Sequence, residues 1–272
     1  MIVESYAKIN WSLRITGRRA DGFHDLETVF QTISLHDTIT LSEAEGLALT
    51  CGDPSIPTGE TNLALRAARA AGAKHLAIHI EKRIPAGGGL GGGSSNAAAT
   101  LIALNKPDPQ IALSLGSDVP FFLVGGTAYA TGRGEILTPM PPMSGIPLLL
   151  VLPEERVMTK DAFARITRYS PPLGIEAYRE WMADGGLRMA DALSAIRHPR
   201  SAIPFTNDFE EPVFALLPRL RAFKQRLLDA GAVWAGMSGS GSTIVGAFKN
   251  PAERDRAAGS FEDVRVERCE SL

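Results

Sequence analysis

A dense run of glycine between residues 87 and 93 limits what this chain can fold into more than any other feature of the sequence. Six of these seven positions are glycine, and Leu90 is the exception. Glycine loses more conformational freedom on folding than any other residue, so such a cluster needs a compensating function that only glycine permits. Two functions fit, a backbone that closely approaches a ligand and a flexible linker.

The residues around the glycine run favour the ligand-binding alternative. The alternating apolar residues at 76–80 predict a strand before the run, and the apolar stretch 97–104 predicts a helix after it. We expect this helix to be capped by Ser94, Ser95 or Asn96. A glycine loop that leads into a helix N-terminus presents unpaired N–H groups and the positive end of the helix dipole, so the pattern predicts a phosphate site.

The run matches neither of the common glycine-rich nucleotide motifs. A Walker A loop ends in Gly-Lys-Ser/Thr, whereas Gly93 precedes Ser94 here, so no lysine within the loop can reach a phosphate. The spacing also satisfies the Rossmann pattern G-x-G-x-x-G, but the acidic residue near the required distance, Asp108, lies in KPDPQ rather than at a strand end. A phosphate bound here needs a cation from elsewhere in the chain.

Composition excludes several classes of function. The 272-residue chain has a formal net charge of -2 and no run of basic residues, so we expect neither nucleic acid nor membrane as a partner. Its N-terminus lacks a charged segment followed by an apolar one, which predicts a cytoplasmic protein. Cys51 and Cys269 stand far apart and outside any metal-binding spacing. The sequence carries no signal for an oligomeric state.

The order of periodic segments predicts an α+β fold with two interlocking lobes. Strand-like segments open the chain, a helix is expected from Thr61 or Asn62 to Gly72, and the run 146–153 is expected to be a buried strand. After about residue 153 apolar residues recur at helical spacing, notably through 209–228. A second glycine-rich turn, Gly236 to Gly241, precedes a strand-like segment and is expected to pack under the first loop. We place the N-terminal domain at 1–151 and the C-terminal domain at 152–272.

Three further places carry residues that could perform chemistry, and each also has a simpler explanation. Lys8 and Asn10 share one face of the first strand, although an edge lysine is often only solvated. Asp118 follows a Gly-Ser turn and could merely cap it. Phe23 and His24 follow Gly22, and such a pair is usually packing. Together, however, they offer the cation and the base that a phosphate loop without a lysine requires.

Four segments of the sequence, in this order, resemble the motifs of the GHMP kinase superfamily. They are AKINWSLRITGRRADGFHDLETVFQTISL, IPAGGGLGGGSSNAAATLIALN, GSDVPFF and GMSGSGSTIVGAF. The stretch GRRADGFHDL is most similar to the branch that acts in the non-mevalonate isoprenoid pathway. The resemblance implies a two-lobed fold, with an N-terminal lobe like ribosomal protein S5 domain 2, an α/β C-terminal lobe and an active site in the cleft between them.

The activity implied by the resemblance is ATP-dependent transfer of the γ-phosphoryl group to the 2-hydroxyl of a methylerythritol linked to cytidine diphosphate. By similarity Asp118 takes the hydroxyl proton, and Lys8 keeps Asp118 ionised. Asn62 matches the adenine-side segment. The triphosphate loop corresponds to Pro85, Ala86, Gly87, Gly88, Gly89, Leu90, Gly91, Gly92, Gly93, Ser94 and Ser95. Mg²⁺ is expected with ATP, and Ser95 is a candidate metal ligand.

The same resemblance implies a cytosine site. Phe23 occupies the place of an aromatic residue, usually tyrosine, that stacks on the base, and His24 hydrogen-bonds it. Phe163 is expected on the other face of the cytosine, with Thr159 and Asn10 near the substrate. Two alternatives stay open: a GHMP kinase for another small alcohol such as mevalonate, and a nucleotide-binding protein without catalysis. Aromatic residues on both faces of a base argue against the first, and the presence of Lys8 and Asp118 against the second.

Overall fold

The computed structural model describes residues 1–184 and 205–272, and these form two compact units. Unit 1 consists of residues 1–8, 33–86 and 90–125, and unit 2 of residues 9–32, 87–89 and 126–272. The two units are interleaved along the chain, because the long strands β1 (Ile2–Arg18) and β2 (His24–Ser42) contribute residues to both. The domain boundary expected at residues 151 and 152 stays a prediction.

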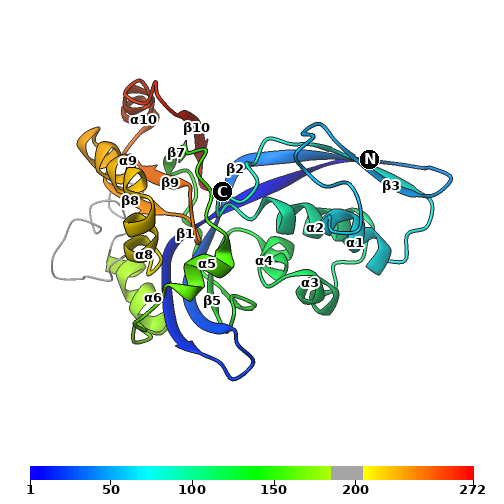
Figure 1. Ribbon diagram of the computed structural model, residues 1–272, viewed down its shortest axis with the longest axis horizontal. Helices are drawn as coiled ribbons and strands as arrows, with labels where there is room; N and C mark the ends of the chain where they lie inside the picture. Colours follow the sequence, from blue (N-terminus) through cyan, green and yellow to red (C-terminus); the bar gives the residue numbers. More distant parts are fainter. Residues whose placement is uncertain (185–204) are drawn as a thin grey trace. The chain divides into compact units, whose positions relative to one another are not determined.

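Unit 1 combines part of a six-stranded sheet with a group of helices. Its further elements are β3 (Leu47–Cys51), α1 (Leu63–Ala70), β4 (Leu76–Glu81), α2 (Gly92–Ala103), α3 (Pro109–Leu115) and α4 (Val119–Val124). β4 pairs antiparallel with the C-terminal part of β2 and parallel with β3. The helices contact one another and are grouped together in Figure 1. Apolar side chains of β2, β3 and β4 pack against α1 to form the core of this unit.

Unit 2 contains the other strands of the six-stranded sheet, a four-stranded antiparallel sheet and most of the described helices of the C-terminal half. Its strands are β5 (Thr127–Thr131), β6 (Ile136–Pro139), β7 (Pro147–Leu152), β8 (Trp234–Met237), β9 (Ile244–Ala247) and β10 (Arg265–Glu270). Its helices are α5 (Thr159–Ala164), α6 (Ile175–Asp184), α8 (Glu210–Leu216), α9 (Pro218–Asp229) and α10 (Pro251–Ala258). The six-stranded sheet has the order β3-β4-β2-β5-β6, in which the N-terminal part of β2 pairs with β5 and β5 pairs with β6, and β1 also pairs with β2. The four-stranded sheet has the order β10-β7-β9-β8.

The strands and helices expected from periodicity are present. β7 is buried along its whole length, as its continuous apolar run predicts. Asn62 caps α1, and Gly72 follows this helix with a φ of 84°, as expected for a helix that ends in a left-handed glycine. The helical spacing over 209–228 yields two helices rather than one, because Pro218 begins α9 directly after α8 ends. Figure 1 shows α8 and α9 beside β8 and β9.

The expected cap of the helix after the glycine run was wrong. α2 begins at Gly92, and its N-cap is Gly91 with a φ of 71° and without a side-chain cap. Ser95 and Asn96 lie inside the helix and are buried, where their side chains bond to residues of β1 and β2. The helix therefore starts within the glycines themselves, which brings its free N–H groups directly to the loop.

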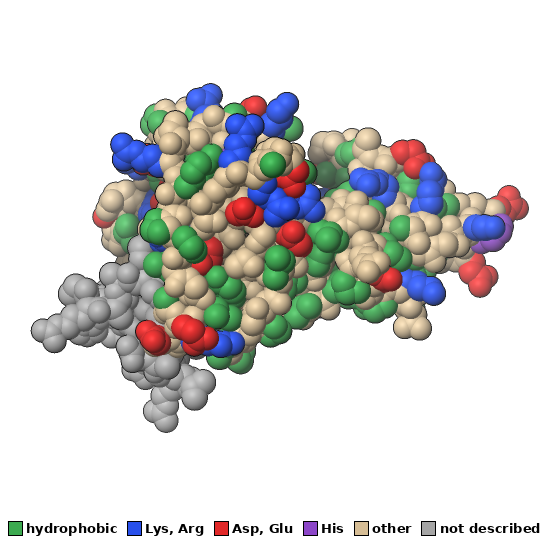
Figure 2. Space-filling model, turned by 90° about the horizontal axis from the view of Figure 1, so that it is seen from below, with side chains coloured by type: hydrophobic (Ala, Val, Ile, Leu, Met, Phe, Trp, Pro, Cys, Tyr) green, Lys and Arg blue, Asp and Glu red, His purple; other side chains and the backbone are tan. Residues whose placement is uncertain are grey.

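On the face shown in Figure 2, basic and acidic side chains are interspersed rather than separated by sign. Within residues 1–184 and 205–272, none of the helices has the length and apolar character that crossing a bilayer requires. Cys51 and Cys269 are both free thiols, and burial raises the pKa of Cys269 to about 12.

Candidate active site

Lys8 and Asp118 form an ion pair in unit 1, although 110 positions of sequence separate them. Lys8 Nζ lies 3.7 Å from Asp118 Oδ2, and the lysine side chain is 4% exposed whereas that of the aspartate is 36% exposed. Asp118 occupies the N-cap position of α4 but makes no side-chain capping bond. The capping explanation of Asp118 is therefore not supported, and its carboxylate is directed at a buried cation.

Burial controls the ionisation of the lysine. Removal from water lowers the pKa of Lys8 from its ordinary value of 10.5, and the negative charge of Asp118 opposes this shift without cancelling it. The other partner, Asp118, is partly exposed and can reach a ligand from the surface of the unit. A buried cation beside an accessible carboxylate is an arrangement suited to proton transfer at a bound hydroxyl.

The start of α2 lies against this ion pair. A β-carbon at Gly91 would be 3.2 Å from Lys8 Cγ and 2.6 Å from the ring of Phe122, so no other residue fits without displacement. The backbone N–H of Lys8 donates to the carbonyl of Leu90 at 3.0 Å. The N-terminal amides of α2, which have no acceptors within the helix, are thus held next to the catalytic candidates. The start of α2 therefore lies against the side chain of Lys8, one member of the ion pair.

Residues 87–89 of the loop pack on the second glycine-rich turn within unit 2. The hydroxyl of Ser238 donates to the carbonyl of Gly89 at 2.9 Å, and the N–H of Thr243 donates to that of Gly88 at 3.3 Å. A β-carbon at Gly89, whose φ is 78°, would lie 2.0 Å from the carbonyl oxygen of Ser238. The sequence-based expectation that this turn packs under the first loop is confirmed.

The sequence interpretation missed Arg156, which lies beside the glycine loop. Its Nη1 is 3.4 Å from the position that a β-carbon of Gly87 would take, and the residue is exposed. No carboxylate pairs with it within the part of the chain that the structure describes. The only sign of such a residue in the sequence was the absence of a lysine from the loop. This absence could not indicate which of the many arginines would lie beside the loop.

The residues expected at the cytosine site fall into two groups in unit 2. The ring of His24 stacks on that of Phe163 with centroids 4.7 Å apart and planes inclined by 16°, and Tyr169 lies 6.2 Å from His24. Phe23, 51% exposed, instead lies under the guanidinium of Arg133 at 4.5 Å. The structure therefore pairs Phe163 with His24 rather than with Phe23. Burial, with a smaller contribution from Arg18, lowers the pKa of His24 from 6.5.

The second glycine-rich turn connects the other expected substrate residues. Thr159 Oγ1 lies 3.1 Å from Ser240 Oγ, and Asn10 Oδ1 accepts a hydrogen bond from the N–H of Gly239 at 2.9 Å. Asn10 also donates to Thr28 Oγ1 at 2.8 Å, so its side chain has a fixed orientation. Sequence reasoning offered no signal for Ser240, because one serine in a Gly/Ser turn is indistinguishable from its neighbours.

Asn62 and Ser95 are both engaged in structural bonds. Asn62 Oδ1 accepts from the N–H of Ala64 at 2.9 Å, and its amide donates to the carbonyl of Pro57 at 2.8 Å. Ser95 Oγ lies 2.7 Å from Ser5 Oγ and is buried. Among the residues placed by the structure, no three His, Cys, Asp or Glu side chains gather as a metal site. The first N–H groups of α2 have no acceptor within the helix, which suits the phosphates of ATP. The roles of the glycine loop toward the triphosphate, of Ser95 toward metal and of Asn62 toward adenine stay predictions.

Comparison with known proteins agrees with this geometry. The model of the GHMP kinase N-terminal domain matches residues 62–126, and that of the GHMP kinase C-terminal domain matches residues 189–264. A 4-diphosphocytidyl-2-C-methyl-D-erythritol kinase of Chlorobium phaeobacteroides (strain BS1) is 40% identical over 96% of this chain and 93% of its own. One of Protochlamydia amoebophila is 36% identical over 91% of this chain and 85% of its own.

Solved structures give the same result. The crystal structure of a 4-(cytidine 5'-diphospho)-2C-methyl-D-erythritol kinase superposes with a TM-score of 0.82 at 35% identity and covers 100% of this chain and 99% of that one. The mevalonate kinase of Methanococcus jannaschii has a TM-score of 0.68 at 16% identity, with 100% and 98% covered, and this likeness concerns the fold alone. The chain has the α+β GHMP kinase fold and belongs to the family of 4-diphosphocytidyl-2-C-methyl-D-erythritol kinases.

Proposed function

We propose that this chain is an ATP-dependent kinase that phosphorylates the 2-hydroxyl of 4-diphosphocytidyl-2-C-methyl-D-erythritol in the non-mevalonate isoprenoid pathway. The observation that carries the proposal is the Lys8–Asp118 ion pair beside the start of α2, where Gly91 contacts the lysine. The names of the relatives support the choice of substrate. A phosphate site, a base and a buried cation are the parts that phosphoryl transfer to an alcohol requires.

In the proposed reaction, Asp118 accepts the proton of the substrate's 2-hydroxyl while the oxygen of this hydroxyl forms a bond to the γ-phosphorus of ATP. The bond from that phosphorus to the bridging oxygen breaks, and ADP leaves. Lys8, positively charged, keeps Asp118 ionised and lowers the pKa of the hydroxyl. The N–H groups at the start of α2 hold the phosphates, and Arg156 supplies the cation that the loop lacks. Magnesium bound with ATP would neutralise charge on the phosphates.

On the substrate side, Phe23, His24 and Phe163 would bind the cytosine, with Thr159 and Asn10 near the rest of the molecule. The lowered pKa of His24 supports this role, because a neutral imidazole presents one donor and one acceptor to a base. The stacking of His24 on Phe163 fixes the plane of the imidazole. We further propose that Arg133, above the ring of Phe23, orients this ring, which lacks the hydroxyl of the usual tyrosine.

The test is a phosphorylation assay with ATP in which the cytidine diphosphate substrate and mevalonate are compared. We expect turnover of the cytidine diphosphate substrate and none of mevalonate. Turnover of mevalonate alone would assign the chain to another alcohol. ATP binding without turnover of either compound would favour a nucleotide-binding protein.

A further inference from the structure

A buried carboxylate outside the proposed catalytic pair lies at the centre of a network in unit 1. Asp37, on β2, is 0% exposed. Its Oδ1 accepts from the N–H groups of Arg83 and Ile84, both at 2.8 Å. Its Oδ2 accepts from Lys82 Nζ at 2.7 Å and from Asn96 Nδ2 at 3.0 Å. Both oxygens of this carboxylate are therefore used, and its charge is balanced by a lysine whose side chain is only 7% exposed.

The partners of Asp37 lie at the two ends of the glycine loop. Ile84 directly precedes Pro85, the first residue of the loop, and Asn96 directly follows Ser95, the last. One carboxylate thus holds the chain where the loop begins and where it ends. A glycine-rich segment has many conformations to lose when it binds a ligand, and fixed ends reduce that loss before binding.

Further contacts extend this arrangement to the first turn of α2. Asn96 Nδ2 also lies 3.1 Å from Ser5 Oγ, which bonds to Ser95 Oγ at 2.7 Å. Lys82 donates to the carbonyl of Ile84 as well, and its Nζ is 3.1 Å from the position of a β-carbon at Gly92. The network therefore contacts the turn whose N–H groups would bind phosphate. Burying an ion pair costs free energy, so its retention at this place calls for a function.

We propose that Asp37 is a positioning residue for ATP: it fixes both ends of the triphosphate loop so that the amides at the start of α2 are held ready for phosphate. The proposal rests on the proposed function, in which that loop binds ATP. Asp37 does not touch the nucleotide. It acts through Lys82, Arg83 and Ile84 on one side of the loop and through Asn96 on the other.

The first test is Asp37→Asn, which preserves the shape of the side chain. The oxygen of asparagine can still accept from Arg83 and Ile84, but its NH₂ group would face the donors of Lys82 and Asn96. We expect the Kd and the KM for ATP to rise about tenfold or more, because hydrogen bonds to a buried charge are lost. The KM for the cytidine diphosphate substrate should stay unchanged. An unchanged Kd for ATP would overturn the proposal.

Exchanging the carboxylate of Asp37 with the amide of Asn96 provides a rescue experiment. In the double variant Asp37→Asn with Asn96→Asp, the network again contains one carboxylate, one amide and Lys82. We expect this variant to recover most of the ATP affinity that the single variant loses. A double variant that binds ATP as weakly as Asp37→Asn would contradict a role for the hydrogen bond between residues 37 and 96. If Asp37→Asn does not fold, Asn96→Ala keeps the ion pair, removes the link to α2 and should also weaken ATP binding. Unchanged ATP affinity in that variant would contradict the proposal.

Leu49→Ala is the matched control. Leu49 lies on β3 in the core of the same unit and belongs to no part of the network. Its truncation should lower stability while the Kd for ATP stays at the wild-type value. A rise equal to that of Asp37→Asn would mean that general destabilisation explains both, which contradicts the proposal. Failure of the wild type to phosphorylate the cytidine diphosphate substrate would instead refute the proposed function, while the Kd series for ATP still decides the role of Asp37.

Discussion

The carboxylate of Asp118 should be essential for turnover and dispensable for ATP binding. It is directed at Lys8 and makes no capping bond to α4, the helix that it precedes. Its replacement therefore removes no cap from this helix. We expect Asp118→Asn to lower kcat by about 10²- to 10⁴-fold, the range for a general base, with the Kd for ATP retained. Steady-state kinetics and calorimetry provide the two measurements. Undiminished kcat would remove the base from the mechanism.

The ionisation of Lys8 should be visible in the pH dependence of kcat/KM. Burial lowers its pKa below 10.5, so the charged form that the mechanism requires is lost as pH rises through this lowered value. We expect an alkaline limb in the profile of kcat/KM, which reports the free enzyme, below pH 10.5. In Lys8→Arg the guanidinium stays protonated, so the limb should vanish even though kcat falls. A limb that persists in this variant belongs to another group.

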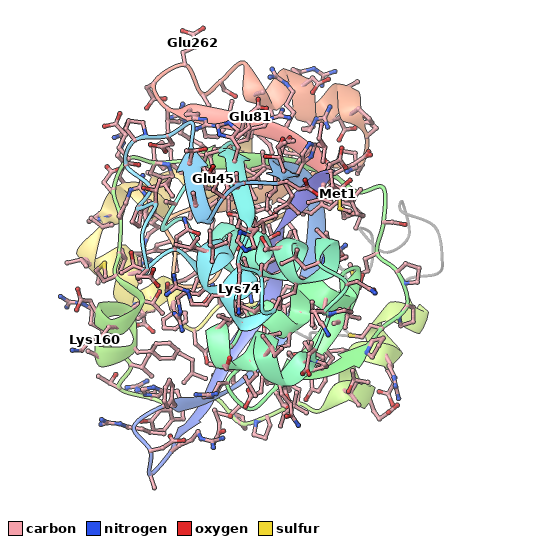
Figure 3. The ribbon with its side chains drawn as sticks, turned by 90° about the vertical axis from the view of Figure 1, so that its right-hand side faces the viewer. Met1, Glu45, Lys74, Glu81, Lys160 and Glu262 are labelled. Carbon is pink, nitrogen blue, oxygen red and sulfur yellow. The ribbon has the colours of Figure 1, made fainter. Side chains whose placement is uncertain are left out.

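The exposed Arg156 should contribute to ATP binding through its charge. We expect Arg156→Ala to raise the KM for ATP severalfold and Arg156→Lys to recover part of the loss. The difference in KM between Arg156→Ala and the wild type should shrink at high salt. Lys160 provides a matched control, because this exposed cation projects outward from α5 in Figure 3. An equal effect of Lys160→Ala would indicate that general positive charge, rather than Arg156, attracts the nucleotide.

Among the larger elements, the glycine loop should lose ATP binding when a side chain is added at Gly89, where the loop is packed. A β-carbon at Gly89 would collide with the backbone of Ser238, and the left-handed φ adds about 1–2 kcal/mol of strain. We therefore expect Gly89→Ala to abolish most ATP binding. Gly59→Ala is the control, since nothing lies within 4 Å of its β-carbon position. Isothermal titration with ATP compares the two, and equal affinities would show that the packing of Gly89 has no bearing on the loop.

The elements themselves were predictable where periodicity is strong. β7 and α1 follow from an apolar run and from a capping asparagine. The start of α2 was not predictable, because serine and asparagine are good caps in general and only the contact of Gly91 with Lys8 and Phe122 selects a glycine there. Such a contact joins segments that are distant in sequence, which local propensity does not contain.

The candidate site, like the helices and strands, was predictable from the sequence only in part. The motifs identified Lys8 and Asp118, and the structure places them 3.7 Å apart. Asp37 gave no signal, since in the alternating pattern of β2 it is one polar residue among several, and its partners follow 45 to 59 positions later. The stacking of His24 on Phe163 depends likewise on two elements whose packing no single-sequence pattern specifies.

For the molecule as a whole, ATP should stabilise the folded state independently of catalysis. A ligand that binds only the folded protein at 100 times its Kd adds about 2.7 kcal/mol of stability, which corresponds to a rise in Tm of roughly 5 to 10 °C for a chain of this size. Because binding at the loop does not need the base, Asp118→Asn should show the same rise as the wild type. Gly89→Ala should show little rise, since its loop cannot close on Ser238. Thermal denaturation with and without ATP measures all three proteins. Loss of the rise in Asp118→Asn would mean that Asp118 contributes to nucleotide binding itself, and the separation of phosphate loop from catalytic pair would have to be abandoned.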